Sequence, residues 1–206
     1  MMDAAKRRGR PRAFDADAVL DSARRVFWGG GFAGSSLDDL AGAMALNRPS
    51  LYGAFGDKQA LYLKTLERYR DESLVLMREM LDPKRSLREG LSAVYAGALA
   101  VYFAQSPARG CFLIGTAATE AVASAPVRDL LRGSLIAFDK ALEQRFQIAR
   151  VSGEIETTAD AAMLARLASA ILHSLAVRAR AGEDKAELEA LAQAGATMIC
   201  GRAGRP

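Results

Sequence analysis

The chain has 206 residues, half of them apolar and a quarter charged, a balance typical of a soluble globular protein rather than a disordered one. No apolar run approaches the roughly 18 residues that a membrane span needs, and the first residues lack the apolar segment of a signal peptide, so we expect a cytoplasmic protein with no membrane partner. One histidine, no glycine-rich phosphate loop and no cluster of metal ligands leave little for an enzyme, a metal site or a cofactor.

Positive charge is concentrated at the start of the chain. Residues 1–14 carry five basic side chains against one acidic side chain, and their net charge of +4 equals that of the whole chain. The remainder is therefore neutral, and a basic arm over residues 1–13 suits a polyanion. The arm contains Arg-Gly-Arg-Pro, the core of an AT-hook, in which Arg10 and Arg12 would lie in a narrow A·T-rich minor groove. The alternative is a solvated basic tail.

Apolar residues recur with a helical period through nearly all of the chain, and no alternating strand pattern competes. Caps, glycines and prolines divide this pattern into about nine helices. We expect them over residues 15–28, from Ser36, from Asn47 or Arg48, from Asp57 to about Leu81, over 86–105, within 111–123, over 127–150 and in two further stretches. The sequence predicts an all-α fold, with an N-terminal three-helix domain over residues 14–60 and a larger helical domain over 61–206.

The segment from Ser36 to Lys58 predicts two short helices joined by a tight turn, which is the helix-turn-helix of DNA-binding proteins. Ser36 and Asp39 have the spacing of a capping box, and Pro49 is tolerated only in the first turn of a helix. The second helix of such a motif lies in the major groove, where the fork of Arg48 could pair with guanine O6 and N7. A solvated surface arginine is the alternative. Phosphate contacts are the expected role of Ser50, Tyr52 and Lys58.

The same region carries a longer pattern, which consists of Phe27, Gly31-Phe32, Ser36-Leu37-Asp38-Asp39-Leu40-Ala41, Leu51-Tyr52, Phe55 and Lys58. Over about residues 14–62 it resembles the DNA-binding domain of TetR-type bacterial repressors. The resemblance implies a dimeric, all-helical repressor whose C-terminal domain binds a small molecule and releases the operator. It also implies phosphate contacts from Ser36, Tyr52 and Lys58, with Arg48, Pro49 and Ser50 at the groove. The full set of expected DNA-binding residues is Arg10, Arg12, Ser36, Asn47, Arg48, Pro49, Ser50, Tyr52 and Lys58.

Two positions depart from the family pattern. The family usually has glycine at the turn where this chain has Ala45, and often has glycine where it has Pro49. In a left-handed turn Ala45 would carry a backbone penalty of about 1 kcal/mol, unless the turn is remodelled.

The C-terminal part offers candidates for a ligand pocket. The run Arg109-Gly110-Cys111-Phe112-Leu113-Ile114 resembles the motif that opens the sixth helix in one large branch of these repressors, but it does not name an effector. Aromatic walls with a few polar groups form ligand cavities in helical bundles, and Glu120 would be the polar anchor. The alternative for each aromatic residue is plain core, and Cys111 and His173 could instead sense oxidation or protons. The candidate pocket residues are Tyr69, Tyr95, Tyr102, Phe103, Phe112, Glu120, Phe138 and His173.

The last two helices carry broad apolar stripes that could pair with a second copy as a four-helix seam. The alternative is that both stripes face the core of the same chain. The expected interface residues are Leu164, Leu167, Ile171, Leu175, Leu188, Leu191, Gly195 and Met198.

The sequence thus predicts a homodimeric transcriptional repressor that binds double-stranded operator DNA and responds to a small molecule of unknown identity. The rival is an architectural protein that coats A·T-rich DNA with little sequence choice. The two differ in discrimination, because a repressor must prefer its site by about 10³-fold or more over random DNA. An enzyme remains the excluded class, since carboxylates such as Glu154 and Glu156 are expected in a solvated turn.

Overall fold

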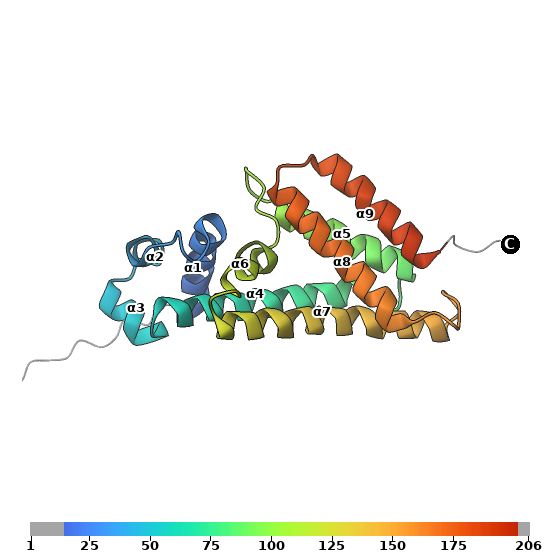
Figure 1. Ribbon diagram of the computed structural model, residues 1–206, viewed down its shortest axis with the longest axis horizontal. Helices are drawn as coiled ribbons and strands as arrows, with labels where there is room; N and C mark the ends of the chain where they lie inside the picture. The colour runs from blue at the N-terminus through green and yellow to red at the C-terminus, as the bar shows by residue number, and fades with distance from the viewer. Residues whose placement is uncertain (1–14, 202–206) are drawn as a thin grey trace, which may run out of the picture.

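The computed structural model describes residues 15–201, and within this range it contains helices, turns and loops but no strand (Figure 1). The all-α prediction is confirmed. The helices are α1 (Ala16–Gly30), α2 (Leu37–Ala43), α3 (Arg48–Phe55), α4 (Lys58–Met80), α5 (Leu87–Tyr102), a π-helical turn (Leu113–Ala117) that continues into α6 (Ala118–Glu120), α7 (Ala125–Val151), α8 (Ala161–Arg180) and α9 (Lys185–Cys200).

The first three helices form a small unit at one end of the molecule (Figure 1). Its core contains Phe27, Leu40 and Leu51, one from each helix and each fully buried. The capping box that the sequence predicts is present, because the Ser36 hydroxyl accepts from the Asp39 N–H at 3.0 Å while the Asp39 carboxylate accepts from the Ser36 N–H at 3.0 Å. These caps and anchors fix where α2 begins and which side of α3 is buried.

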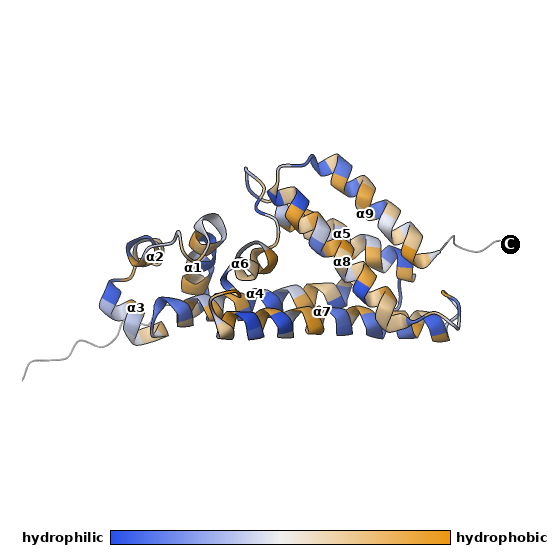
Figure 2. Cartoon of the chain, in the orientation of Figure 1, coloured by the Kyte–Doolittle hydropathy of each residue, from blue (hydrophilic) through white to orange (hydrophobic). Residues whose placement is uncertain are grey.

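Helix α4 leads from this unit into the larger one, so the expected boundary at residue 60 falls inside a helix. It packs against α1 near its start and against α7 along the long axis of the molecule (Figure 1). Figure 2 shows hydrophobic residues alternating with hydrophilic ones along α7, as expected of a helix with one buried face. The long helices α4 and α7 therefore form the base on which α5 and α8 lie, and α9 packs on α5 and α8.

Helix α8 packs against α5, α7 and α9 and buries Leu172 and Leu175 in the shared core. Among the described residues it is the one helix long and apolar enough, by length and composition alone, to cross a membrane. The sequence-based statement that no such stretch exists was therefore too strict. A core helix of a soluble protein passes the same test, and the packing of α8 on three neighbours fits that explanation.

The apolar stretch over residues 111–123 does not form the single regular helix that its pattern suggests. The turn over Leu113–Ala117 is π-helical, and α6 ends after one further turn. Just before it, Gly110 has a φ of 63° and lies so close to α8 that an added Cβ would sit 2.2 Å from the Ala176 carbonyl oxygen. Only glycine fits at this point, because any side chain would collide with the backbone of α8. Gly110 lies in the loop between α5 and the π-helical turn.

Glu154 is more than the solvated turn residue that the sequence suggests. Its carboxylate accepts from Arg145 at 2.9 Å and from the Leu87 N–H, and Arg145 is only 2% exposed. Burial raises the pKa of the Glu154 carboxyl, but the Leu87 N–H and the Arg145 guanidinium outweigh burial and bring the pKa below its ordinary value of 4.5. The pair joins the end of α7 to the start of α5.

We expect Glu154→Gln to lower the free energy of unfolding by about 2 kcal/mol at pH 7, because it leaves the buried Arg145 without its counter-charge. A carboxyl with a lowered pKa stabilises the fold above its unfolded pKa and loses this effect as the pH falls through the folded pKa. The deficit of the variant should therefore shrink below pH 4.5 in urea denaturation of the full chain.

The matched control is Glu156→Gln in the same exposed loop, which should change stability by less than about 0.5 kcal/mol. A Glu154→Gln protein as stable as the wild type at pH 7 would show that the pair contributes nothing.

Candidate functional site

Helix α3 presents a polar, exposed side away from the core. Leu51 and Phe55 are buried, whereas Arg48, Ser50 and Tyr52 are exposed, Tyr52 to 47%. Pro49 also lies exposed in the first turn, while Arg10 and Arg12 fall outside the described residues. The structure thus gathers Arg48, Pro49, Ser50 and Tyr52 on one side of a short helix, as a groove-reading helix requires.

Asn47 has a structural task at the head of this helix. Its side-chain oxygen accepts from the Ser50 N–H at 2.8 Å, which makes it the N-cap of α3. The exposed residue keeps its amide N–H₂ group, but its oxygen is committed to the cap. Ser36 has the corresponding task at the head of α2.

Arg48 is held by a carboxylate of the preceding helix. Its Nε donates to Asp38 Oδ1 at 2.8 Å and its Nη2 donates to Asp38 Oδ2 at 2.6 Å. The Arg48 guanidinium holds the pKa of Asp38 below its ordinary value of 3.8, although both groups are exposed. The two-pronged contact orients the guanidinium across the start of α3 and links the two helices of the helix-turn-helix.

Lys58 lies at the first position of α4, where its ammonium is 4.4 Å from the centroid of the Phe32 ring. Phe32 in turn lies 5.1 Å from the ring of Tyr62 and 6.3 Å from that of Phe27. The half-buried lysine thus rests on an aromatic group that belongs to the core of the small unit.

The turn between α2 and α3 is left-handed at Ala45, a backbone conformation that costs free energy for alanine but not for glycine. Ala45 has a φ of 50°, which makes it the only non-glycine residue with positive φ among the described residues. The Leu46 N–H donates to the Ala41 carbonyl at 3.0 Å and the Ala45 N–H to that of Gly42 at 3.1 Å. These two bonds form a Schellman cap, in which glycine is the preferred residue at the position of Ala45.

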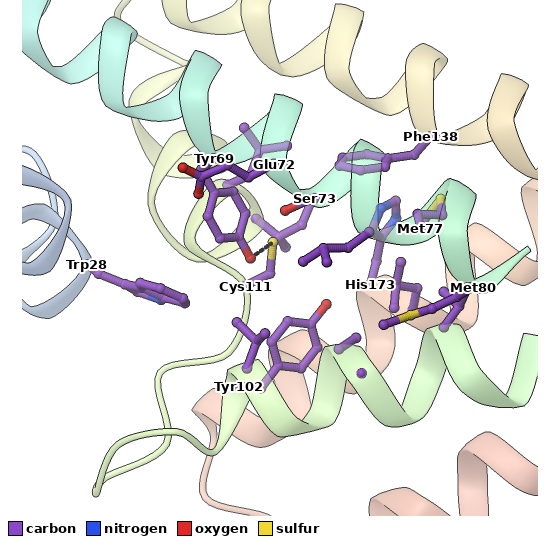
Figure 3. Close-up of a pocket in the computed structure, with 18 of the residues that line it drawn as sticks. Trp28, Tyr69, Glu72, Ser73, Met77, Met80, Tyr102, Cys111, Phe138 and His173 are labelled. Carbon is purple, nitrogen blue, oxygen red and sulfur yellow. Dashed lines mark hydrogen bonds between the residues drawn. The ribbon is translucent and has the colours of Figure 1, made fainter. Parts of the chain in front are cut away.

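A cavity of about 260 Å³ lies on the other side of α1, between α4, α5, α7 and α8 (Figure 3). Four of the predicted pocket residues line it: Tyr69, Tyr102, Phe138 and His173. The walls are mainly aromatic and aliphatic, with Ser73, Glu72 and Arg24 as polar groups. This composition is typical of a small-molecule site.

The other four predicted pocket residues do not line this cavity. Tyr95 is buried and donates its hydroxyl to the Ala168 carbonyl at 3.1 Å, and Phe103 packs on the core at the end of α5. Phe112 is fully buried among the rings of Trp28, Tyr62 and Tyr69. Glu120 lies half-buried at the end of α6 and is not the polar anchor of the cavity. Three of these residues are core, and Glu120 lies at the end of α6, outside the cavity lining.

Sequence reasoning missed several residues that line the cavity. Met77 and Met80 continue the inward face of α4 beyond Tyr69, so their helical spacing could have indicated them. Arg24 and Trp28 come from α1. Nothing in the sequence pattern indicates that the first helix borders a pocket of the larger unit.

The titratable groups of the cavity are uncharged or paired. Burial lowers the pKa of His173 below its ordinary value of 6.5, and nearby Asp139 only partly offsets this, so the imidazole is neutral at pH 7. Burial raises the pKa of the Cys111 thiol, whose sulfur accepts from the Tyr69 hydroxyl at 3.6 Å. A reactive cysteine needs the opposite shift. The Cys111 thiol thus lacks the lowered pKa of a reactive cysteine, and His173 would gain a proton only below pH 6.5.

The predicted interface residues on α8 and α9 separate into two groups. Leu175 and Leu188 are buried, and an added Cβ on Gly195 would lie 2.7 Å from Ile171 of the same chain. These three residues therefore pack inside the chain, because α8 and α9 pack on each other and on α5. The residues left partly or largely exposed are Leu164, Leu167, Ile171, Leu191 and Met198.

Ala45→Gly should raise the free energy of unfolding by about 0.5–1 kcal/mol, because glycine removes the left-handed strain in excess of its own entropy cost. Ala43→Gly, two residues earlier in the last turn of α2, is the matched control and should lower it by about the same amount. Urea denaturation of both variants checks this expectation. Equal losses in both would show that the φ of Ala45 carries no strain.

Comparisons with known proteins follow the same division of the chain. Residues 19–65 match the model of bacterial regulatory proteins of the tetR family, and residues 88–195 match that of the tetracyclin repressor-like C-terminal domain. The HTH-type transcriptional repressor ComR of Escherichia coli K12 is 30% identical over 195 residues, which cover 94% of this chain and 91% of ComR.

Two solved structures are similar over nearly their whole length. The regulator CifR, a cysteine mutant in complex with 26-bp operator DNA, is 31% identical, with a TM-score of 0.78 over 91% of this chain and 98% of CifR. A putative TetR regulator from Rhodococcus sp. RHA1 is 30% identical, with a TM-score of 0.60 over 90% of this chain and 98% of that one. The chain therefore belongs to the TetR family of sequence-specific, DNA-binding transcriptional regulators.

Proposed function

We propose that this protein is a homodimeric repressor that leaves its operator when a small molecule fills the cavity between α4, α5, α7 and α8. The observation that carries the proposal is the pairing of two sites on one chain: an exposed reading helix at one end and an apolar cavity bordered by the helix that follows it. A DNA-coating protein has no need for such a cavity. The E. coli relative ComR is named as a repressor, which supports the same direction of control.

The DNA contacts follow from the chemistry of the exposed groups. Arg48 supplies a fork that matches guanine O6 and N7, and its release from Asp38 makes it available to a base. Tyr52 and Lys58 supply a hydroxyl and a cation for phosphates, and Ser36 and Ser50 supply two further hydroxyls. Arg10 and Arg12 extend the contact into an adjacent minor groove.

Selection from random duplex DNA tests this function. The full chain should enrich a palindromic site, because a dimer with two-fold symmetry presents the two copies of α3 to two half-sites. Binding to the selected duplex at physiological salt should exceed binding to its scrambled form by about 10³-fold or more. Equal affinity for both duplexes would favour the architectural alternative over the repressor.

Two variants distinguish base recognition from phosphate binding. Lys58→Gln should weaken binding to every sequence and reduce the slope of log K against log salt by about 1, whereas Lys140→Gln on the exposed side of α7 should leave the slope unchanged. Arg48→Ala should relax the preference at one base position by about 1–3 kcal/mol. A uniform loss for Arg48→Ala, without a change in preference, would place Arg48 on the backbone instead.

The dimer would use the exposed part of the apolar stripes. Leu167 is 49% exposed on α8 and Met198 is 82% exposed on α9, so both are free to meet a second copy. An isologous contact of these two helices would cover apolar surface that otherwise faces water.

We expect Leu167→Asp to raise the dissociation constant of the dimer at least about tenfold, because it places an unpaired charge in an apolar contact. Val151→Asp, at an 87% exposed position at the end of α7, is the matched control and should leave assembly unchanged. Sedimentation velocity measures both. An unchanged dimer in Leu167→Asp would exclude this face of α8.

A further inference from the structure

The cavity crosses the boundary between the two units of the protein. Most of its lining comes from α4, α5, α7, α8 and residues 111–114, but Arg24 and Trp28 belong to α1 of the DNA-facing unit. Figure 3 shows Trp28 reaching from α1 toward Tyr69, Tyr102 and Cys111. A molecule in this cavity would therefore touch both units at once.

Trp28 is held by contacts that also join the two units. Its indole N–H donates to the Arg109 carbonyl at 3.4 Å, and the Arg109 side chain donates back to the Arg25 carbonyl of α1 at 3.2 Å. Its ring lies edge-on to Tyr69 at 5.5 Å between centroids and 5.7 Å from Phe112. Displacement of this ring would disturb the contact of α1 with the segment that lines the cavity.

A second set of contacts at the rim ties α1 to α4. Arg24 donates to Glu72 at 2.6 Å, and Arg68 donates to the same Glu72 at 2.7 Å and pairs with Asp17. Arg24 and Glu72, the two charged groups that line the cavity, thus neutralise each other. A charged guest would find no unpaired counter-charge there, and its burial would cost free energy.

The chemistry of the walls identifies the class of guest. Four aromatic rings, those of Trp28, Tyr69, Tyr102 and Phe138, surround the space. Methionine and aliphatic side chains fill the remaining wall, and Met80 packs so closely on Gly97 that an added Cβ would sit 2.4 Å from its Cε. Flat, uncharged molecules gain most from such walls, through ring packing and apolar burial.

We propose that the cavity binds an uncharged aromatic molecule and that Trp28 passes its presence directly to the DNA-facing unit. This inference rests on the proposed function and adds to it the class of the ligand and the residue that couples the two sites. A ligand shifts the equilibrium between two conformations only if it binds them with different affinity. A ligand that contacts α1 would bind differently to conformations in which α1 lies in different positions. The shift reaches the DNA side through Phe27, which is next to Trp28 in α1, and through Phe32, which follows α1 and lies against both the Phe27 ring and the Lys58 ammonium.

The test uses N-phenyl-1-naphthylamine, an uncharged aromatic probe whose fluorescence rises in apolar sites, with the full-length chain. Trp28 is the single tryptophan of the sequence, so energy transfer from tryptophan to the probe reports binding beside it. We expect transfer in the wild type and its loss in Gly97→Leu, whose added side chain displaces the end of Met80 and takes up space in the cavity. Saturating probe should lower the affinity for the duplex selected above about tenfold in the wild type and not at all in Gly97→Leu.

Two wall variants separate binding from coupling. Trp28→Phe changes the wall that belongs to α1, and Phe138→Leu changes the wall that belongs to α7. Both should bind the probe more weakly, as its own fluorescence reports. At saturation, Phe138→Leu should keep the tenfold loss of DNA affinity, whereas Trp28→Phe should lose less than about threefold.

Several results would overturn the inference. They are no probe binding by the wild type, transfer that survives Gly97→Leu, or a full tenfold effect in a folded Trp28→Phe protein. Hydrogen exchange in α1 of the wild type gives a readout that needs neither variant nor DNA: unchanged exchange on probe binding would equally reject the coupling. If the chain selects no specific duplex, the proposed function fails by itself, while the transfer and exchange measurements still judge the site.

Discussion

The packing of α1 against α4 is the contact on which the rest of the structure depends. Phe27 is fully buried, 4.9 Å from the ring of Tyr62, and Arg68 reaches from α4 to Asp17 on α1. The rings supply the apolar burial that holds the helices together, while the partly exposed ion pairs contribute less to stability and more to their register. Because α4 runs on into the larger unit, this contact, together with the hydrogen bonds of Trp28 and Arg109, sets where the small unit lies relative to the cavity.

The two candidate sites use opposite physical means. On the DNA side, exposed side chains that can form hydrogen bonds lie on a short helix. Leu51 and Phe55 of this helix are buried and anchor it, so the polar groups face solvent from a fixed helix. In the cavity, the walls are mainly aromatic and aliphatic, and the charged residues that line it, Arg24 and Glu72, are paired. One site is suited to a polyanion and the other to an apolar ligand, and α4 contributes to both, through Lys58 at its start and through the residues that line the cavity.

Local signals in the sequence predicted much of the fold, whereas the cavity depended on contacts that no local signal contains. The cap at Ser36 defines where α2 begins, whereas the proline in the first turn of α3 and the helical spacing of Leu51 and Phe55 define where α3 begins and which side of it is exposed. All of these signals are short-range. The place of Trp28 in the cavity depends on how α1 packs on the loop at residues 109–110, which lies some eighty residues away. Leu175 was predicted at the dimer interface but is buried inside the chain. The broad apolar stripe of α8 does not reveal which part of it faces the core.

The pairing of Arg48 with Asp38 bears on how the protein chooses among sequences. A guanidinium already bound by two hydrogen bonds to a carboxylate gains little from a partner that offers a single acceptor, because the exchange would then lose a bond. Among the base edges of the major groove, guanine presents two acceptors in the matching geometry. If Arg48 reads a base as proposed, release from Asp38 lowers the free energy gained at every base by the same amount, and only a partner with two acceptors restores both hydrogen bonds. Asp38 thus sets a minimum strength that a base contact of Arg48 must exceed before it adds to binding.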